Sequence, residues 1–171
     1  NLPGVRLAGQ ASGTVFPIGV TTVRHSYTDS AGNTGPQCVF TVTVHRRPQA
    51  PNRGIFICDD DTVDFNLQDH VDSLGNSVAS TFEWIAISAT AGVSGQSTTL
   101  QSGPIIDDVL DNSTRVNQTV IYRVWPSSAT VPPCPGPPFD IHVTVRPSSR
   151  VRILPSDICP GDQLDVAKLV R

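Results

Sequence analysis

The sequence of 171 residues contains no methionine, a single lysine and few aromatic side chains, which make up 6% of its residues. Its net charge of −3 lacks the basic field of nucleic-acid-binding proteins, so no nucleic-acid partner is expected. No apolar run approaches the roughly 18 residues that a membrane-spanning helix requires. There is no initiator methionine and no signal peptide. We therefore expect an internal or processed segment that does not span a membrane.

Catalytic patterns are also missing. Ser94 lies in a run similar to a nucleophile elbow, but Gln96 stands where that motif needs glycine. The four histidines are scattered and show no metal-ligand spacing such as His-Glu-x-x-His: His25, His45, His70 and His142. The sequence therefore predicts a protein that is not an enzyme and has no cofactor.

What the sequence does contain is an internal repeat. The run PQCVFTVTV (36–44) returns 101 residues later as PPFDIHVTV, and ICDDDTVDF (57–65) returns at the same offset as ICPGDQLDV. Two landmarks with one offset indicate a tandem array of modules of about 100 residues. The expected divisions are the C-terminal part of one module in 1–46, a linker in 47–53, a complete module in 54–147, a second linker in 148–156 and the start of the next module in 157–171.

Short segments of alternating polarity, punctuated by 15 prolines and 13 glycines, favour an all-β fold. Trp84 shares one face of a strand with Phe82 and Ala86, so we expect Trp84 in the core. Trp125 precedes Pro126, which is expected to end its strand, and Trp125 is not assigned to the core. The expected strands are 21–27, 37–44, 54–58, 62–67, 81–88, 96–101, 118–125 and 139–145.

Proline and arginine dominate the two linkers, which predicts short, semi-rigid spacers. Six of the 12 basic residues lie in the wider joints 45–53 and 146–155, and six of the 15 acidic residues lie between Asp59 and Asp72. A basic linker beside an acidic module end would set the angle between neighbouring modules. The alternative is ordinary solvated charge, which contributes under about 1 kcal/mol per pair.

Four cysteines allow three pairings. Cys38 and Cys58 lie on strands expected to run end to end through a linker, so their separation is on the order of 60 Å, against the 7 Å or so between Cα atoms that a disulfide allows. Cys134 and Cys159 fail in the same way. We therefore predict a disulfide between Cys58 and Cys134, partners for Cys38 and Cys159 outside the sequence, and an oxidising, extracytoplasmic compartment. Buried free thiols are the alternative.

Residues 1–46 resemble the C-terminal half of a hyalin repeat (HYR), an immunoglobulin-like module. The phrases that carry this resemblance are SGTVFPIGVTTV (12–23), YTDSAGN (27–33) and CVFTVTV (38–44). The resemblance implies that Cys38 is bridged to an early strand of its own module.

Residues 54–147 resemble the PKD-like domains that occur in tandem in very large secreted proteins of Bacteroidota. The run ICPGD (158–162) is similar to the start of another such domain. The phrases that carry the resemblance, in order, are ICDDDTVDFNL (57–67), FEWIA (82–86), IIDDVLDNST (105–114), TVIYRVWP (119–126) and CPGPPFDIHVTV (134–145).

By resemblance, the chain is a stalk segment of a cell-surface adhesin that is exported by the type IX pathway and supports surface adhesion and gliding motility. The implied fold is a row of immunoglobulin-like β-sandwich modules joined end to end, outside the cell and attached to the outer membrane. Its implied partners are neighbouring modules of the same chain, surface polysaccharide and other cell-surface proteins. The alternatives are a carbohydrate- or ligand-binding module, for which Trp125 is the candidate contact, and an accessory domain of a secreted hydrolase.

Two kinds of candidate site remain. Asp59, Asp60 and Asp61 offer hard oxygen ligands for Ca²⁺, although acidic loops are often simply solvated. A second acidic run offers the same chemistry: Asp107, Asp108 and Asp111. The bacterial resemblance also implies O-glycosylation within Asp-Ser/Thr-apolar triplets, at Ser30, Thr62 and Ser73. Asn112 and Asn117 fit the eukaryotic N-linked acceptor pattern, which a bacterial source would make incidental.

Overall fold

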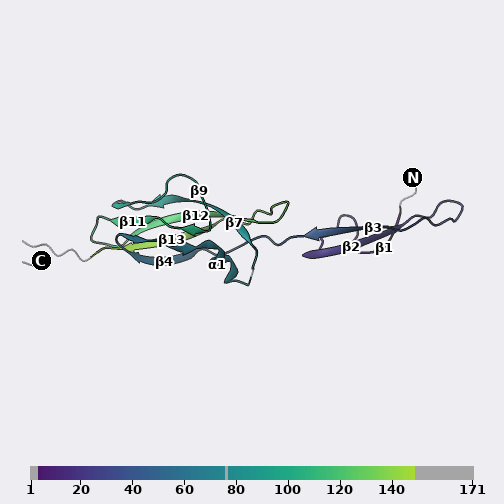
Figure 1. Ribbon diagram of the computed structural model, residues 1–171, viewed down its shortest axis with the longest axis horizontal. Helices are drawn as coiled ribbons and strands as arrows, with labels where there is room; N and C mark the ends of the chain where they lie inside the picture. Colours follow the sequence, from purple (N-terminus) through teal and green to yellow (C-terminus); the bar gives the residue numbers. More distant parts are fainter. Residues whose placement is uncertain (1–3, 76, 149–171) are drawn as a thin grey trace, which may run out of the picture.

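The computed structural model describes residues 4–75 and 77–148, and it consists almost entirely of β-strands (Figure 1). The prediction of an all-β fold is confirmed. In Figure 1 two units follow each other along the long axis of the molecule. The module start predicted in 157–171, which includes Cys159, lies outside the described residues. No helix in the described ranges is long and apolar enough to span a membrane.

The first unit comprises β1 (Val5–Ala8), β2 (Gly19–Ser26) and β3 (Cys38–Val44). The second unit comprises β4 (Arg53–Cys58), β5 (Asp61–Thr62), β6 (Phe65–Asn66), α1 (Leu67–Asp72), β7 (Ser80–Ala89), β8 (Val93–Ser94), β9 (Gln101–Ser102), β10 (Ile105–Ile106), β11 (Val109–Asn112), β12 (Gln118–Ser128) and β13 (Phe139–Arg146).

The first unit is a single antiparallel sheet in the order β1-β2-β3. Val23 of β2 lies opposite Phe40 of β3, so the two side chains point to the same face. Val23 is buried, whereas Phe40 keeps 47% of its surface exposed. The alternation seen in the sequence therefore does place apolar residues on one face. That face is only partly covered in the described residues, because the single sheet has no second layer of strands to pack against.

The second unit is built on a five-stranded sheet in the order β4-β13-β12-β7-β9. Along β12, Val120, Tyr122 and Val124 are fully buried and the residues between them are partly exposed, which is the period of two expected of a half-buried strand. Trp84 of β7 is only 3% exposed and meets the Tyr122 ring edge-on, with ring centroids 5.8 Å apart. The predicted core position of Trp84 is confirmed.

Short strands and one helix cover the inner face of this sheet. The strands pair in the orders β5-β11-β8 and β10-β6, and α1 follows β6 directly. Asn66 caps α1, because its side-chain oxygen accepts hydrogen bonds from the backbone N–H groups of Gln68 and Asp69. The inner layer contributes fully buried side chains to the core: Leu67, Val71, Ile106 and Leu110.

Two predicted strands are wrong. The strand expected over 62–67 breaks at Val63 and Asp64, and the chain turns into α1 at the Asn66 cap. The strand expected over 96–101 is absent except for Gln101 at its end. Here the backbone N–H of Ser97 donates to the carboxylate of Asp108, and this donor is therefore not available to a neighbouring strand.

Pro126 does not end its strand, contrary to the prediction, since β12 continues to Ser128. Phe139, the first residue of β13, lies opposite Val124, so beyond Val124 the strand β12 no longer pairs with β13 and on that side contacts the segment before it, through an isolated bridge between Ser127 and Pro135. A proline tolerates such an edge because its missing N–H removes no ladder hydrogen bond there. The Pro126 carbonyl faces the same side and accepts a hydrogen bond from the Gly136 N–H.

The first and last long strands of the second unit, β4 and β13, are parallel neighbours. Arg53 pairs with Ile141 at one end and Cys58 pairs with Arg146 at the other. The chain therefore enters the unit at the end that holds Arg53 and Phe139, here called the entry pole. It leaves at the opposite end, which holds Cys58 and Arg146 and is here called the exit pole.

Candidate functional site

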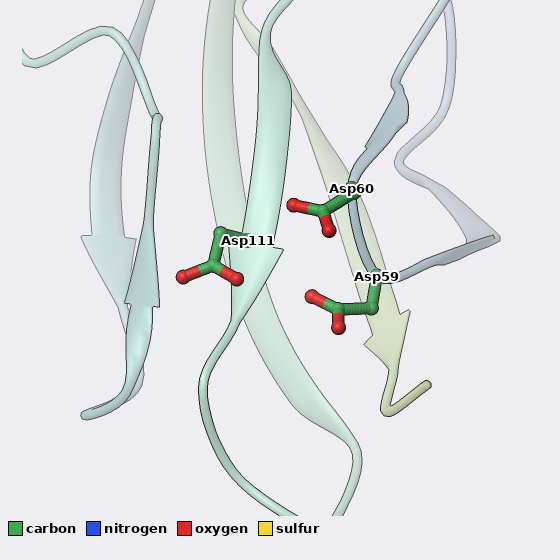
Figure 2. Close-up of side chains that lie close together, drawn as sticks. All are labelled: Asp59, Asp60 and Asp111. Carbon is green, nitrogen blue, oxygen red and sulfur yellow. The ribbon is translucent and has the colours of Figure 1, made fainter. Parts of the chain in front are cut away.

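Three carboxylates meet at the exit pole. Asp59 and Asp60 lie in the turn between β4 and β5, and Asp111 lies on β11. Figure 2 shows the first two side chains pointing from that turn toward the third. One oxygen atom from each carboxylate lies within 4.8 Å of the other two. The pairing of β5 with β11, in which Leu110 lies opposite Asp61, brings these distant parts of the sequence together.

Hydrogen bonds already engage part of this acidic cluster. Asp59 Oδ1 accepts from the backbone N–H of Asn112 at 2.6 Å, and Asp59 Oδ2 accepts from the Ser148 hydroxyl at 2.7 Å. Asp111 Oδ2 accepts from the Ser94 hydroxyl at 3.4 Å. Asp60 is exposed. The cluster thus connects the outgoing linker to β11, and its oxygens are of the type that Ca²⁺ prefers. The assignment of Ca²⁺ to this cluster stays a prediction.

The cluster combines members of both acidic runs and leaves the others out. Asp61, on β5, turns back to the end of β4, where its Oδ2 accepts from the Cys58 N–H at 3.3 Å. Asp108 lies deeper: Oδ2 accepts from the Ser97 N–H and the Tyr122 hydroxyl, and Oδ1 accepts from the Ser97 hydroxyl. Burial and the neighbouring Asp108 carboxylate raise the pKa of Tyr122 above its ordinary value of 10.0. Asp108 is therefore a structural anchor for the loop and the core tyrosine.

The disulfide predicted between Cys58 and Cys134 is not formed, and both cysteines are free. Cys58 is opposite Arg146 at the exit pole, whereas the backbone of Cys134 is hydrogen-bonded to Ser128 beyond the entry end of β13. Measured along β12, the positions of the two cysteines are about eleven residues apart, which is on the order of 35 Å. A disulfide requires Cα atoms within about 7 Å. The prediction placed Cys58 on the first strand and Cys134 just before the last strand, where both lie, but it did not say which pole each would occupy.

Trp125 lies on the outer face of the five-stranded sheet and is 39% exposed. Glu83 of β7 lies directly opposite it, and Arg123 lies two residues earlier on the same face. Arg123 makes a bidentate ion pair with Asp140 of β13, with N–O distances of 2.9 and 3.0 Å. This pairing holds the pKa of Asp140 below its usual range. An exposed indole beside a fixed guanidinium–carboxylate pair is thus present on an open sheet face.

All three candidate O-glycosylation residues are exposed. Ser30 lies in a turn held by Asp29, whose carboxylate accepts from the N–H groups of Ala31 and Asn33 and from the Asn33 side chain; these hydrogen bonds lower the pKa of Asp29. Thr62 lies on β5, and Ser73 ends α1, where its hydroxyl donates to the His70 carbonyl. Their modification stays a prediction.

Asn112, in contrast, is fully buried and belongs to the architecture of the exit pole. Its side-chain N–H groups donate to the carbonyls of Val116 and Val145, and its side-chain oxygen accepts from the backbone and hydroxyl of Thr114. An asparagine held in this way is not accessible to an enzyme that attaches glycans to the folded protein.

The remaining polar candidates are dispersed. His25 stacks on Phe40 in the first unit, and His70 lies buried between Phe65 and Phe139 in the second. The glycine after Ser94 has a structural explanation: Gly95 has φ of +96°, and a Cβ atom there would lie 2.0 Å from the Val109 carbonyl oxygen. The glycine in the elbow-like run is therefore explained by the close approach of Gly95 to the backbone of Val109.

Sequence reasoning missed the joining of Asp111 to the Asp59 turn. Each acidic run was visible by itself, but no local pattern indicated that β5 and β11 would pair. The structural roles of the buried Asn112 and the partly buried Asp108 were also missed, because nothing in the local sequence distinguishes these residues from ordinary loop residues.

Comparisons with known protein families match the two units of the structure separately. Residues 5–44 match the HYR domain, and residues 56–149 match the PKD-like domain. Hyalin of Strongylocentrotus purpuratus is 56% identical to this chain over 32 residues, which cover 19% of this chain and 3% of hyalin. The chain thus spans a very small part of that relative. No solved structure matches the chain significantly.

The two matched domains are non-catalytic modules of extracellular, adhesion-type repeat proteins. The match to the PKD-like domain covers more than half of the 171 residues and contains almost the whole second unit. The chain therefore belongs to the PKD-like domain family, with an HYR-type unit preceding its PKD-like unit.

Proposed function

We propose that this chain is a spacer segment in the stalk of a large secreted cell-surface adhesin. The observation that carries the proposal is the parallel pairing of β4 with β13, which places the entry and the exit of the second unit at opposite poles. A module of this topology adds its full length to the chain of modules. A module whose ends lay at one pole would add little reach.

The same pairing suits a stalk under tension. A pull on both linkers draws β4 toward the entry pole and β13 toward the exit pole, so the strands are loaded along their length. Six register pairs, from Arg53–Ile141 to Cys58–Arg146, then resist together. The second unit achieves this without a disulfide in its described residues, in place of the bridge that the sequence predicted.

The proposed setting is the surface of a bacterium of the Bacteroidota, with export by the type IX pathway, attachment to the outer membrane and a role in adhesion and gliding motility. The support for this setting is the resemblance of residues 54–147 to the PKD-like domains of secreted proteins of Bacteroidota. Peptide mass spectrometry of the natively produced protein tests this setting: sugar on Ser30, Thr62 or Ser73 supports it. Sugar on Asn117 and bare serines would contradict it.

The spacer role is tested by replacing residues 47–148 of the parent protein with an unrelated β-sandwich of similar length whose ends lie at opposite poles. Adhesion of cells should be retained, because the role depends on reach and not on side-chain chemistry. A control replacement whose ends lie at one pole should weaken adhesion. Loss of adhesion with the first replacement would contradict the spacer role.

A second candidate function is the binding of surface polysaccharide, and it rests on Trp125. An exposed indole stacks on the apolar face of a sugar ring, and the neighbouring Arg123–Asp140 pair offers fixed partners for hydroxyl groups. The test is retention of the chain on immobilised polysaccharides. Loss of retention in Trp125→Ala, with an unchanged unfolding midpoint and normal retention of the control Val116→Ala, would favour binding. Equal retention of both variants would remove this candidate.

A further inference from the structure

The segment between the two units is seated on the second unit over most of its length. Pro48 is buried, although a proline in a free linker would be exposed. Its carbonyl oxygen lies where a Cβ atom on Gly136 would be, at 1.9 Å from the ideal Cβ position. Only glycine at position 136 leaves room for this contact.

Two further contacts hold the segment after Pro48. The Pro51 carbonyl accepts a hydrogen bond of 2.9 Å from Nε2 of His70. The His70 ring is itself fixed, since it is 8% exposed and meets the rings of Phe65 and Phe139 edge-on at 5.5 Å. This carbonyl is therefore bound by a side chain that has little freedom to move.

The last contact leads directly into the sheet. The Asn52 side-chain oxygen accepts from the Asp140 N–H at 2.8 Å, and Arg53 then begins β4 opposite Ile141. Between Pro48 and Pro51, Ala50 packs against the hydrophobic core. Residues 48–52, which precede β4, therefore belong to the fold of the second unit.

We infer that residues 48–52 are a fixed docking segment and not a spacer, so that the pivot between the units lies before Pro48. β3 ends at Val44 and the docking segment begins at Pro48, so at most three residues, 45–47, change the angle. An open crevice spans this pivot and faces the loop before Gly136. The residues that line it are Thr43, Val44, His45, Arg47, Val131, Pro132 and Cys134.

The sequence predicted one semi-rigid linker over the whole of 47–53, whereas residues 48–52 are docked. The docking does not depend on the function of the second unit, because it concerns only where the chain bends. A short pivot next to a fixed segment makes the angle between the units depend on very few backbone dihedrals. Bending would then be limited by contact of the residues on the two sides of the crevice.

The test is one insertion placed at two sites in the full chain. Gly-Gly inserted after Arg46 enters the pivot and should leave the unfolding midpoint of the second unit unchanged. Gly-Gly inserted after Gln49 shifts Pro48 relative to Pro51 and Asn52, so the docking contacts can no longer all form. We expect this insertion to lower the midpoint by about 5 °C or more. Equal midpoints for the two insertions would overturn the inference.

A pair of glycine substitutions keeps the inference testable if the second insertion does not fold. Gly136→Ala should release the docking segment, so hydrogen exchange at the amides of Ala50, Asn52 and Arg53 should accelerate about tenfold or more while exchange in β12 stays slow. Gly54→Ala is the matched control, because a Cβ atom there meets nothing within 4 Å. Equal exchange at these three amides in the two variants would also overturn the inference.

Discussion

The hydroxyl of Tyr122 donates a hydrogen bond of 2.7 Å to Oδ2 of Asp108 and so joins the centre of the five-stranded sheet to the inner layer. Tyr122 has no exposed surface, and the same carboxylate holds the backbone and the hydroxyl of Ser97. One carboxylate thus fixes both a core side chain and a loop. Its removal should therefore affect stability more than its position in a loop suggests.

Tyr122→Phe should lower the free energy of unfolding by about 1 to 2 kcal/mol, because it removes one hydrogen bond to a charged acceptor and keeps the ring. Asp108→Ala should cost more, about 3 kcal/mol, since it also leaves the buried Tyr122 hydroxyl and the Ser97 N–H without their acceptor. Urea unfolding measures both changes. Equal losses in the two variants would contradict the role given to Asp108.

Stability should also fall in alkaline solution. The pKa of Tyr122 is raised above 10.0 in the folded chain, so the folded state keeps its proton while the unfolded state releases it. The contribution of this proton is therefore complete below about pH 10 and is lost as the pH rises above that value. Urea unfolding at pH 8, 10 and 11 should show the stability advantage over Tyr122→Phe shrinking. An advantage that is constant with pH would contradict this prediction.

Asn112→Ala should destabilise the second unit by about 2 to 4 kcal/mol, because the buried Asn112 side chain no longer donates to the carbonyls of Val116 and Val145, the second of these bonds being buried. Asn117→Ala is the matched control at an exposed position, with an expected change within about 0.5 kcal/mol. Thermal or urea unfolding gives both values. A small effect of Asn112→Ala would show that the exit pole does not depend on this side chain.

The acidic cluster at the exit pole should be a source of repulsion in the absence of a cation. In a chelating buffer, Asp111→Asn should raise the free energy of unfolding by about 0.5 to 1 kcal/mol, the size of a like-charge contact near water. Asp107→Asn, an exposed carboxylate outside the cluster, should change it by less than about 0.5 kcal/mol.

Calcium at millimolar concentration gives the opposite signature if the cluster binds it. The natural chain would then gain stability, and Asp111→Asn would gain less. This result would contradict the expectation that the chain has no cofactor. Calcium-independent unfolding of the natural chain would agree with a cluster that serves only the outgoing linker.

The outer-face ion pair between Arg123 and Asp140 should contribute little, although its geometry is good. Arg123 keeps 41% of its side chain exposed, and exposed pairs contribute at most about 1 kcal/mol. A double-mutant cycle with Arg123→Met and Asp140→Asn should therefore give a coupling energy below about 1 kcal/mol. A larger coupling would indicate that this face is more shielded than its exposure suggests.

The sequence by itself determined the features that depend on short-range pattern. The period of two placed Trp84 inside and Ile85 toward the other face, because alternation along one strand requires no knowledge of its partners. The offset of 101 residues predicted modules of about 100 residues, because each repeat carries the same local phrases, and the repeat at 158–166 lies outside the described residues.

Only the tertiary structure decided which distant residues meet. Asp111 joined Asp59 because β5 pairs with β11, and Cys58 was separated from Cys134 because the parallel pairing of β4 with β13 put them at opposite poles. Pro48 became part of the second unit because Gly136 leaves it room. Such outcomes depend on strand order, direction and register, which are set by the packing of the whole unit and are not encoded in the pattern of any one segment.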